Sequence, residues 1–374
     1  MMNKQASVLL YAMMLMAVIV FFLQAIIQTT FIERLFTKVM IGREQAELLA
    51  VSGIDLAVAR LTLVEKDDKK DEDVPSADGK PVDKQTKQLR KQLHRILPHL
   101  NRWQTFTFKE KSDGFDGEIK LCISCEAGKI NLNEAFDFKK MDFNPPYNTY
   151  FKGLEIQNVL KSGELYERLV TFFKKRKKKL DDISQLTTIK ELKMLGSIFY
   201  VPPKMPEAKH PSQSNRDIAL TDLFTIWSKD ATVNPLWFSD SMRAVLGLRR
   251  PHADDEIKHE EEFKKSIAAI TPAMAQDWDA NWAPLEPLYG AKSQPVTDFK
   301  AIFTKEFEPR IYSVLSCGKV EQVECSVLAI IELQDNKQKP EDKKADTAAN
   351  ASDQDANAPV PLKKKYKILR MYWM

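Results

Sequence analysis

The sequence has little of what most catalytic and metal sites are built from. It holds 4 cysteines, 12 glycines and 5 histidines in 374 residues. No glycine-rich phosphate loop occurs, and the scattered histidines form no His-x-x-x-His pair of the kind that binds zinc on one helix face. No serine or cysteine stands in a recognisable nucleophile motif. These absences lead us to expect that the protein is not an enzyme.

Four cysteines are too few for a disulfide scaffold in a chain of this length. Cys122 and Cys125 are three residues apart in a predicted strand, so their side chains should point to opposite faces. Cys317 and Cys325 bracket a predicted hairpin, and a loop of three or five residues would place them opposite each other. An oxidising compartment would then permit a disulfide between them, but the register is left open.

The charges nearly cancel, with a formal net charge of +4, which argues against a dedicated nucleic-acid binder. The sharpest basic run, Lys174–Lys179, could contact phosphates, but a solvated helix end explains it more simply. The acidic groups Asp254–Glu256 and Glu260–Glu262 could bind calcium through their carboxylates, although an exposed charged helix is the simpler interpretation. Calcium is the one cofactor that these residues suggest.

The start of the chain is rich in apolar residues. No charge occurs from Ala6 to Ile32, and Val8–Ile27 supplies the roughly 20 residues that cross a bilayer core. This run exceeds the apolar region of a signal peptide, about 7–15 residues, and no small-residue cleavage site follows it. Lys4 predicts a cytoplasmic N-terminus under the positive-inside rule. We therefore expect a single transmembrane helix over residues 7–28, with the main domain outside the cytoplasm.

A helical apolar period continues past the membrane as far as Leu61, with charges such as Glu33, Arg34 and Lys38 on another face. No proline interrupts it, so one helix from Ser7 to Val64 would be roughly 85 Å long. Residues 29–64 are predicted to lay an amphipathic stripe on a globular domain.

The rest of the chain predicts an α+β fold, because segments with strand character flank a mostly helical block. These segments are Thr105–Glu110, Glu118–Ser124, Arg310–Cys317, Val323–Leu333 and Tyr366–Trp373. We expect a small antiparallel sheet packed on the long helix, built from residues 92–132 and 300–374. Residues 133–299 are predicted to form a large all-helical insertion. The charged segments 65–91 and 335–364 are predicted to be a linker and a disordered loop.

The segment EAGKINLNEA, Glu126–Ala135, leaves a strand through Gly128 and enters a helix. Asn131 and Asn133 are candidate turn and N-cap residues, because their side-chain oxygens can accept from free backbone N–H groups. A weaker echo occurs at Val233–Asn234, and Ser239 can cap the helix that follows it. A capped amphipathic helix is predicted between them, over Leu180–Gly196. The pattern predicts two related helical modules within the insertion.

These features resemble the type IV pilin and pseudopilin class, and within it the K subunit of type II secretion pseudopili, the general secretion pathway protein K family. The residues that carry the resemblance are the short leader, SGIDLAVARL (Ser52–Leu61), the turn residues Glu126, Gly128, Lys129, Asn131, Asn133 and Asn234, and the closing strand YKILRMYWM (Tyr366–Met374). In that family the turn leads into a helical domain of sterile-alpha-motif-like halves.

The resemblance implies that a dedicated peptidase removes the leader. The class is usually cleaved after glycine, whereas Ala6 stands there in this chain, so the mature protein would begin at Ser7. Most members carry glutamate at the fifth mature position, where this chain has Tyr11. The K subunit also lacks that glutamate.

The resemblance further implies a minor pseudopilin at the tip of the pseudopilus, in the bacterial inner membrane with its main domain in the periplasm. Its partners would be I- and J-type minor pseudopilins and the inner-membrane assembly platform. The helix residues that would pack against partner helices are Leu15, Val18, Phe22, Phe31 and Leu35. Calcium is known in the family, so the resemblance implies a possible calcium site, whose ligands are not assigned to particular residues here.

Three other functions are compatible with the sequence. The chain could be a minor pilin of a type IV pilus or a DNA-uptake machine. It could be a membrane-tethered binding protein or an enzyme with an unfamiliar site. It could also bind nucleic acid through Lys174–Lys179, in which case binding would depend steeply on salt.

Overall fold

We analysed the chain in a computed structural model. It describes residues 2–62, 84–153, 163–189, 220–229, 231–246, 248, 267–271, 278, 282, 285, 301–303, 310–334 and 366–374. The chain divides into two compact units. Unit 1 comprises Met1–Gly53, Thr105–Lys120 and Cys317–Ser326, and unit 2 comprises Ile54–Gln104, Leu121–Ser316 and Val327–Met374. The predicted loop over 335–364 lies outside the described residues.

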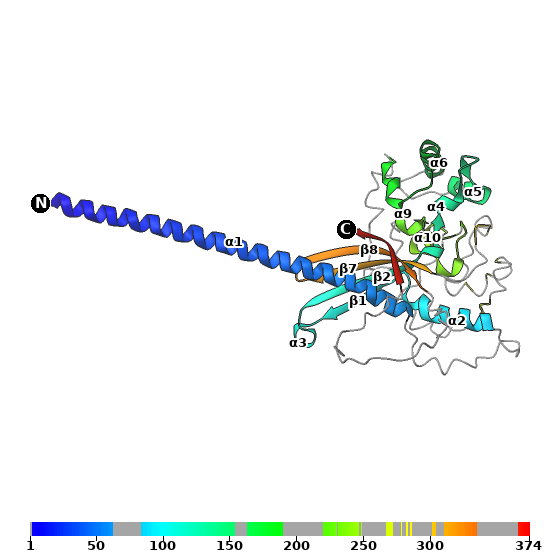
Figure 1. Ribbon diagram of the computed structural model, residues 1–374, viewed down its shortest axis with the longest axis horizontal. Helices are drawn as coiled ribbons and strands as arrows, with labels where there is room; N and C mark the ends of the chain where they lie inside the picture. Colours follow the sequence, from blue (N-terminus) through cyan, green and yellow to red (C-terminus); the bar gives the residue numbers. More distant parts are fainter. Residues whose placement is uncertain are drawn as a thin grey trace, which may run out of the picture. The chain divides into compact units, whose positions relative to one another are not determined.

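The longest element is helix α1, which spans Met2–Thr62 without interruption (Figure 1). It has the bounds that the sequence predicted to within a few residues, because no proline breaks the apolar period. Among the described residues, α1 is the one helix long and apolar enough to cross a membrane, and its most apolar window has a mean hydropathy of 2.2 and no buried residues.

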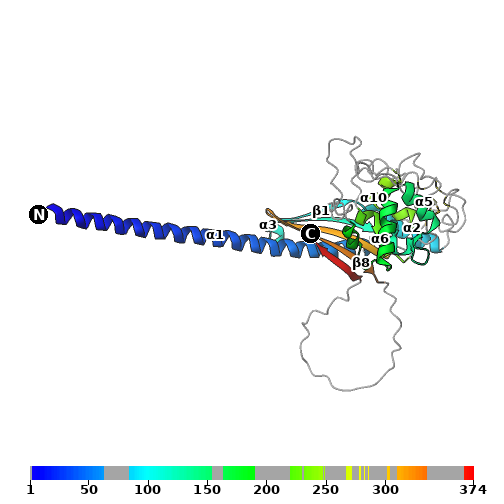
Figure 2. The same cartoon turned by 90° about the horizontal axis from the view of Figure 1, so that it is seen from above.

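The fold is α+β, with α1 packed on a five-stranded antiparallel sheet (Figures 1 and 2). The strand order is β1-β2-β7-β8-β9, with bounds Trp103–Phe108, Gly117–Cys125, Ile311–Val320, Val323–Leu333 and Tyr366–Trp373. Each of the five predicted strands is confirmed. Strands β8 and β9 run antiparallel, with a register shift between Ile330 and Ile331.

In unit 1, α1 packs on the hairpin β7–β8 and on the ends of β1 and β2. Its buried core is formed by Ala46, Leu49, Ile119 and Val320. Partly buried apolar side chains that pack against this core are Phe106, Phe108, Phe115, Val323 and Cys325. A short helix, α3 (Glu110–Asp113), joins β1 to β2 and ends at Gly114, whose φ of 81° favours glycine.

Gly318 in β7 lets the backbone of α1 approach the sheet directly. A Cβ at this position would lie 2.2 Å from the carbonyl oxygen of Ala46 and 2.6 Å from the amide nitrogen of Ala50. Gly42 lies one turn earlier on α1 and faces Val323, at 3.4 Å from a Cβ placed there. A side chain at Gly318 would therefore separate the strand from the helix, whereas a Cβ at Gly42 would make an ordinary van der Waals contact with Val323.

The predicted amphipathic stripe is packed in its C-terminal part only. Ala46, Ala50, Ile54, Ala57 and Leu61 are buried. The prediction was wrong for the first part of the stripe, because every side chain of α1 over residues 29–41 is exposed. The helical period of the apolar residues shows that one face of the helix is apolar. It does not show whether the same chain covers that face.

Unit 2 contains α2 and η2, which precede β1, and the helices and short strands between β2 and β7. Their bounds are α2 Lys84–Ile96, η2 Leu97–His99, η3 Glu126–Gly128, β3 Ile130–Asn131, α4 Leu132–Ala135, β4 Phe136–Asp137, β5 Asp142–Phe143, α5 Pro145–Gly153, α6 Glu164–Arg176, η4 Ile183–Thr188, α9 Leu220–Leu223, β6 Phe224–Thr225, η5 Pro235–Trp237 and α10 Asp240–Val245. Those labelled η are 3-10 helices. α5 packs against α6 and α9 against α10 (Figure 1). Phe136, Phe143, Phe151 and Phe173 form an aromatic cluster among these elements.

Three details of the predicted domain plan were wrong. Residues 84–91, assigned to the charged linker, begin α2, because Leu89, Leu93 and Ile96 form a buried stripe that the charged composition obscured. The block after residue 133 is not all-helical, since β4 pairs with β5 and β6 with β3. The amphipathic helix predicted over Leu180–Gly196 is a 3-10 helix over Ile183–Thr188, and residues 190–196 lie outside the described part.

We predict that Gly318→Ala lowers the free energy of unfolding of the full chain in detergent by about 1–3 kcal/mol, because the new methyl group must push α1 off the sheet. Denaturant unfolding would measure the loss. Gly153→Ala is the matched control, since a Cβ there meets nothing within 4 Å. Equal stability of the two variants would contradict the close packing at Gly318.

Candidate functional site: an exposed helix and a buried turn

The residues predicted to pack against partner helices are all exposed along α1. Their exposed fractions are 65% for Leu15, 51% for Val18, 64% for Phe22, 62% for Phe31 and 49% for Leu35. Burying apolar surface is worth about 25 cal/mol per Å². An exposed apolar surface of this length therefore indicates contact with lipid or with other proteins.

The predicted leader boundary lies within the helical backbone of α1. Ala6 and Ser7 belong to its first turns, and their side chains are outside what the structure describes. Tyr11, at the fifth position after that boundary, is 69% exposed. The structure therefore brings the leader and the apolar surface onto one continuous helix.

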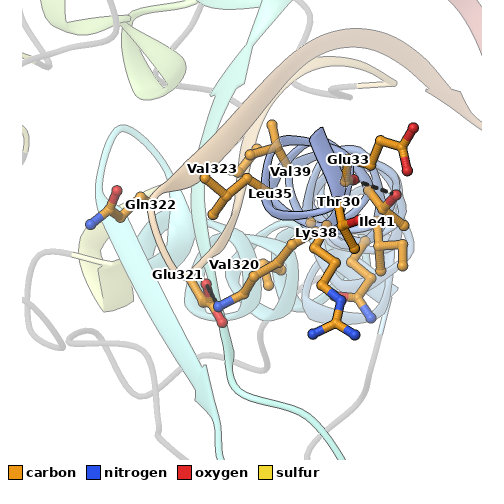
Figure 3. A pocket seen from close by; sticks show the side chains of 14 residues that line it. Thr30, Glu33, Leu35, Lys38, Val39, Ile41, Val320, Glu321, Gln322 and Val323 are labelled. Atoms are coloured by element: carbon orange, nitrogen blue, oxygen red, sulfur yellow. Dashed lines mark hydrogen bonds and ion pairs between the residues drawn. The ribbon is translucent and has the colours of Figure 1, made fainter. Parts of the chain in front are cut away.

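A groove lies in unit 1 where α1 passes the turn between β7 and β8 (Figure 3). It has a volume of about 780 Å³ and is lined by α1 residues from Thr30 to Gln45 and by Val320–Val323. The Lys38 ammonium nitrogen lies 2.9 Å from a carboxylate oxygen of Glu321. Both side chains are more than half exposed, so this ion pair contributes little to stability.

In unit 2, the turn after β2 is built on a buried ion pair. The Lys129 ammonium donates to Glu126 at 2.6 Å, to the Ser313 hydroxyl at 2.8 Å and to the Thr221 carbonyl at 3.2 Å. Lys129 and Glu126 are each 2% exposed. The three donors of the ammonium are thus all used, which offsets the large cost of removing the charge from water.

Gly128 occupies a position that no side chain could share. A Cβ there would lie 1.7 Å from the carbonyl oxygen of Trp237. Directly beside it, the Asn234 amide donates to the Ala127 carbonyl at 2.8 Å. The predicted turn motif and its predicted echo at Asn234 therefore lie against each other.

The two motifs share one capping geometry. The Asn131 side-chain oxygen accepts from the Asn133 amide at 3.0 Å, and the Asn234 side-chain oxygen accepts from the Leu236 amide at 2.9 Å. Each begins a short helix, as the sequence predicted. Ser239 is confirmed as the cap of α10, because its hydroxyl oxygen accepts from the Met242 amide at 3.2 Å.

Asn133 has a different role from the predicted one. Its side chain donates to the Leu180 carbonyl at 2.8 Å and accepts from the Leu180 amide at 2.6 Å. It therefore holds the segment before η4 in place, and Asn131 alone caps α4.

Two aspartates that the sequence did not single out connect distant segments of unit 2. Asp222 accepts from the Ser124 hydroxyl at 3.2 Å and from the Ser241 amide at 2.8 Å. Asp182, which caps η4, lies 3.0 Å from the Arg370 guanidinium and accepts from the Tyr372 hydroxyl at 2.9 Å. Burial and this hydrogen bond raise the pKa of Tyr372. A local cap signal existed for Asp182, but the contacts to β9 are long-range.

The disulfide suggested for Cys317 and Cys325 is not present, since all four cysteines are free. The hairpin has a two-residue turn at Glu321–Gln322 instead of a loop of three or five residues, which places Ser326 opposite Cys317. Burial raises the pKa of the Cys317 thiol. Burial also raises the pKa of Cys125, to about 12.

Three of the six residues in the basic run Lys174–Lys179 form ion pairs within unit 2. Arg176 and Lys178 contact Asp181 at 2.8 and 3.6 Å, and Lys179 contacts Glu134 at 2.6 Å. These pairs agree with a solvated helix end. Within the described residues, no group of three or more His, Cys, Asp or Glu side chains could hold a metal ion. The acidic groups Asp254–Glu256 and Glu260–Glu262 lie outside the described part.

No family model matches the chain, and no curated protein matches it. A solved structure that matches is a chain of the GspK-GspI-GspJ complex from the type 2 secretion system of enterotoxigenic Escherichia coli, with 12% identity and a TM-score of 0.33. The match covers 92% of this chain and 99% of that chain. The long N-terminal apolar helix is consistent with a pseudopilin.

We predict that Lys129→Met lowers the free energy of unfolding by about 3–5 kcal/mol, because it leaves Glu126 buried without its partner. The double variant Glu126→Gln/Lys129→Met should lose less, since no charge remains buried. Lys140→Met is the control, because Lys140 pairs with Asp137 but is 75% exposed. Chemical denaturation of the full chain measures the free energy of unfolding of all three variants. An unchanged free energy of unfolding for Lys129→Met would refute the stabilising role of the Glu126–Lys129 ion pair.

Proposed function

We propose that the protein is a minor pseudopilin of the K type, acting in assembly of a type II secretion pseudopilus and hence in protein export. The observation that carries this proposal is α1, one helix whose exposed apolar surface, from Tyr11 to Ile41, continues into a segment packed on a sheet. A helix of this kind anchors the chain in a bilayer and offers a long contact surface to other helices. The turn residues Glu126, Gly128 and Lys129, which carry the sequence resemblance, have a structural role that fits it.

In this proposal the apolar part of α1 spans the bacterial inner membrane once, with its N-terminus in the cytoplasm and the main domain in the periplasm. Its partners are I- and J-type minor pseudopilins and the inner-membrane assembly platform. Leu15, Val18 and Phe22 pack against partner helices within the bilayer, and Phe31 and Leu35 continue that contact outside it. No cofactor is required for this role, although calcium remains a candidate ligand.

The tip of the pseudopilus is the proposed position. A bulky domain such as unit 2 would obstruct subunits stacked above it. Tyr11 supports the same position, because the glutamate found there in most pilin-like subunits meets the N-terminus of a neighbouring subunit. A subunit at the tip has no such neighbour above it.

A minor pilin of a type IV pilus or of a DNA-uptake machine would use α1 in the same way. The Glu126–Lys129 turn favours the K-type pseudopilin over these, since that turn is part of the resemblance to the K family.

We predict that the protein purified from membranes of cells containing a prepilin peptidase begins at Ser7. Mass spectrometry and N-terminal sequencing would show this directly. Ala6→Gly, which restores the usual residue before the cleavage point, is the matched control and should be processed at least as completely. An intact N-terminus in both proteins would remove the pilin pathway from the proposal.

We predict that Leu15→Arg abolishes assembly with the partner pseudopilins, because arginine at the centre of a membrane helix costs about 2.5–3.5 kcal/mol. Co-purification with I- and J-type subunits measures assembly, and carbonate extraction shows whether the chain is still inserted. Ser52→Arg, on an exposed face of the same helix beyond the membrane segment, is the control. Normal co-purification of the Leu15 variant would count against the packing role.

A further inference from the structure

The groove between α1 and the β7–β8 turn has the size and chemistry of a ligand site. Its volume of about 780 Å³ falls within the range of about 300–1,000 Å³ typical of small-molecule sites. Its lining holds two basic side chains, Arg34 and Lys38, and two acidic ones, Glu33 and Glu321. The groove belongs wholly to unit 1, so its geometry does not depend on how the units are placed.

The position of the groove along α1 places it at the surface of the membrane, and this step rests on the proposed anchorage of the helix. The uncharged segment Ala6–Ile32 is roughly 40 Å long at about 1.5 Å per residue. A bilayer measures about 40–45 Å when its headgroups are included. Arg34 therefore leaves the membrane at the level of the outer headgroups, and the β7–β8 turn lies one helical turn further along, where Glu321 meets Lys38.

Arg34 and Lys38 are four residues apart, so they lie on one face of α1. Side chains of a helix lean toward its N-terminus, which here is the direction of the bilayer. Lysine and arginine side chains at such a position reach back to the phosphate layer. Lys38 is held beside Glu321 (Figure 3), while Arg34 is exposed and makes no ion pair with any residue that the structure describes. Both cations are thus placed to meet a phosphate from the membrane side.

The balance of charges selects the kind of headgroup. Glu33 points away from the β7–β8 turn (Figure 3), so the charged groups on the turn side of the groove are Arg34, Lys38 and Glu321. This set complements a headgroup that carries both a phosphate and an ammonium. A phosphate would lie against Arg34 and Lys38, and a primary ammonium would donate to Glu321. A quaternary ammonium has no N–H donors and could not make that hydrogen bond.

We propose that this groove binds the headgroup of a phosphatidylethanolamine molecule from the outer leaflet of the membrane that α1 crosses. The bound lipid links the β7–β8 turn to the membrane surface and fixes the depth at which unit 1 begins. Charge-assisted hydrogen bonds to the phosphate supply the affinity, and the ammonium contact to Glu321 supplies the selectivity.

The test places the photo-crosslinker p-benzoylphenylalanine at Gln322 of the full chain, in nanodiscs of phosphatidylethanolamine with phosphatidylglycerol. Mass spectrometry after irradiation should show a phosphatidylethanolamine adduct. The double variant Arg34→Gln/Lys38→Gln should reduce its yield at least tenfold, because both phosphate contacts are lost. The control variant Arg43→Gln/Glu47→Gln removes an exposed ion pair of the same helix outside the groove and should leave the yield unchanged.

Three results would overturn the proposal: an unchanged yield in the Arg34 and Lys38 variant, an equal yield in nanodiscs of phosphatidylcholine, or a crosslink in cell membranes that joins position 322 only to the helix of another subunit. Carbonate extraction of cell membranes that contain the same variants separates this inference from the proposed function. A chain that washes off the membrane refutes the anchorage itself, whereas an anchored chain without the adduct refutes the lipid site alone.

Discussion

The contact between the backbone of α1 and the backbone of β7 is the constraint on which the rest of unit 1 depends. At Gly318 no side chain separates helix from strand, and Ala46 and Ala50 present the smallest surface that a helix can offer without glycine. The close contact between α1 and β7 buries Leu49 and Val320 in a small core that also contains Ala46 and Ile119. The same contact sets where α1 stops touching the sheet, and so how much of its apolar surface stays open.

The sequence predicted the elements well wherever the signal is local. The period of apolar residues, the absence of proline and the alternation in the strands fixed α1 and all five strands of the sheet. Cap chemistry identified Asn131, Asn234 and Ser239, since each needs only a backbone amide two or three residues along the chain. The sequence motif Glu126–Ala135 was interpreted as structural. The close packing of Gly128 against Trp237 and the buried ion pair of Lys129 agree with that interpretation.

Long-range partners could not be predicted in the same way. Nothing near Asp182 in the sequence indicates Arg370 and Tyr372, and nothing near Lys129 indicates Ser313. The prediction of a Cys317–Cys325 disulfide was wrong because it depended on the length of the hairpin turn, which the sequence does not determine. A change of one residue in that length moves Cys325 to the opposite face of the hairpin from Cys317. The open part of the α1 stripe was missed for a related reason, because an apolar face has the same period whether it is covered by its own chain or by something else.

The unbroken course of α1 has a mechanical consequence. From Met2 to Ile41 the helix contains neither glycine nor proline, so it has no built-in hinge between the expected membrane segment and the point where it meets the sheet. A pull or a twist applied at the membrane end therefore reaches the Ala46–Gly318 contact without being absorbed on the way. A force along the helix axis acts on that contact in shear. All the packed residues of α1 and β7 then resist the force at the same time, and their contacts are not broken one after another. A displacement of the membrane end of α1 would therefore carry the unit 1 part of the sheet with it.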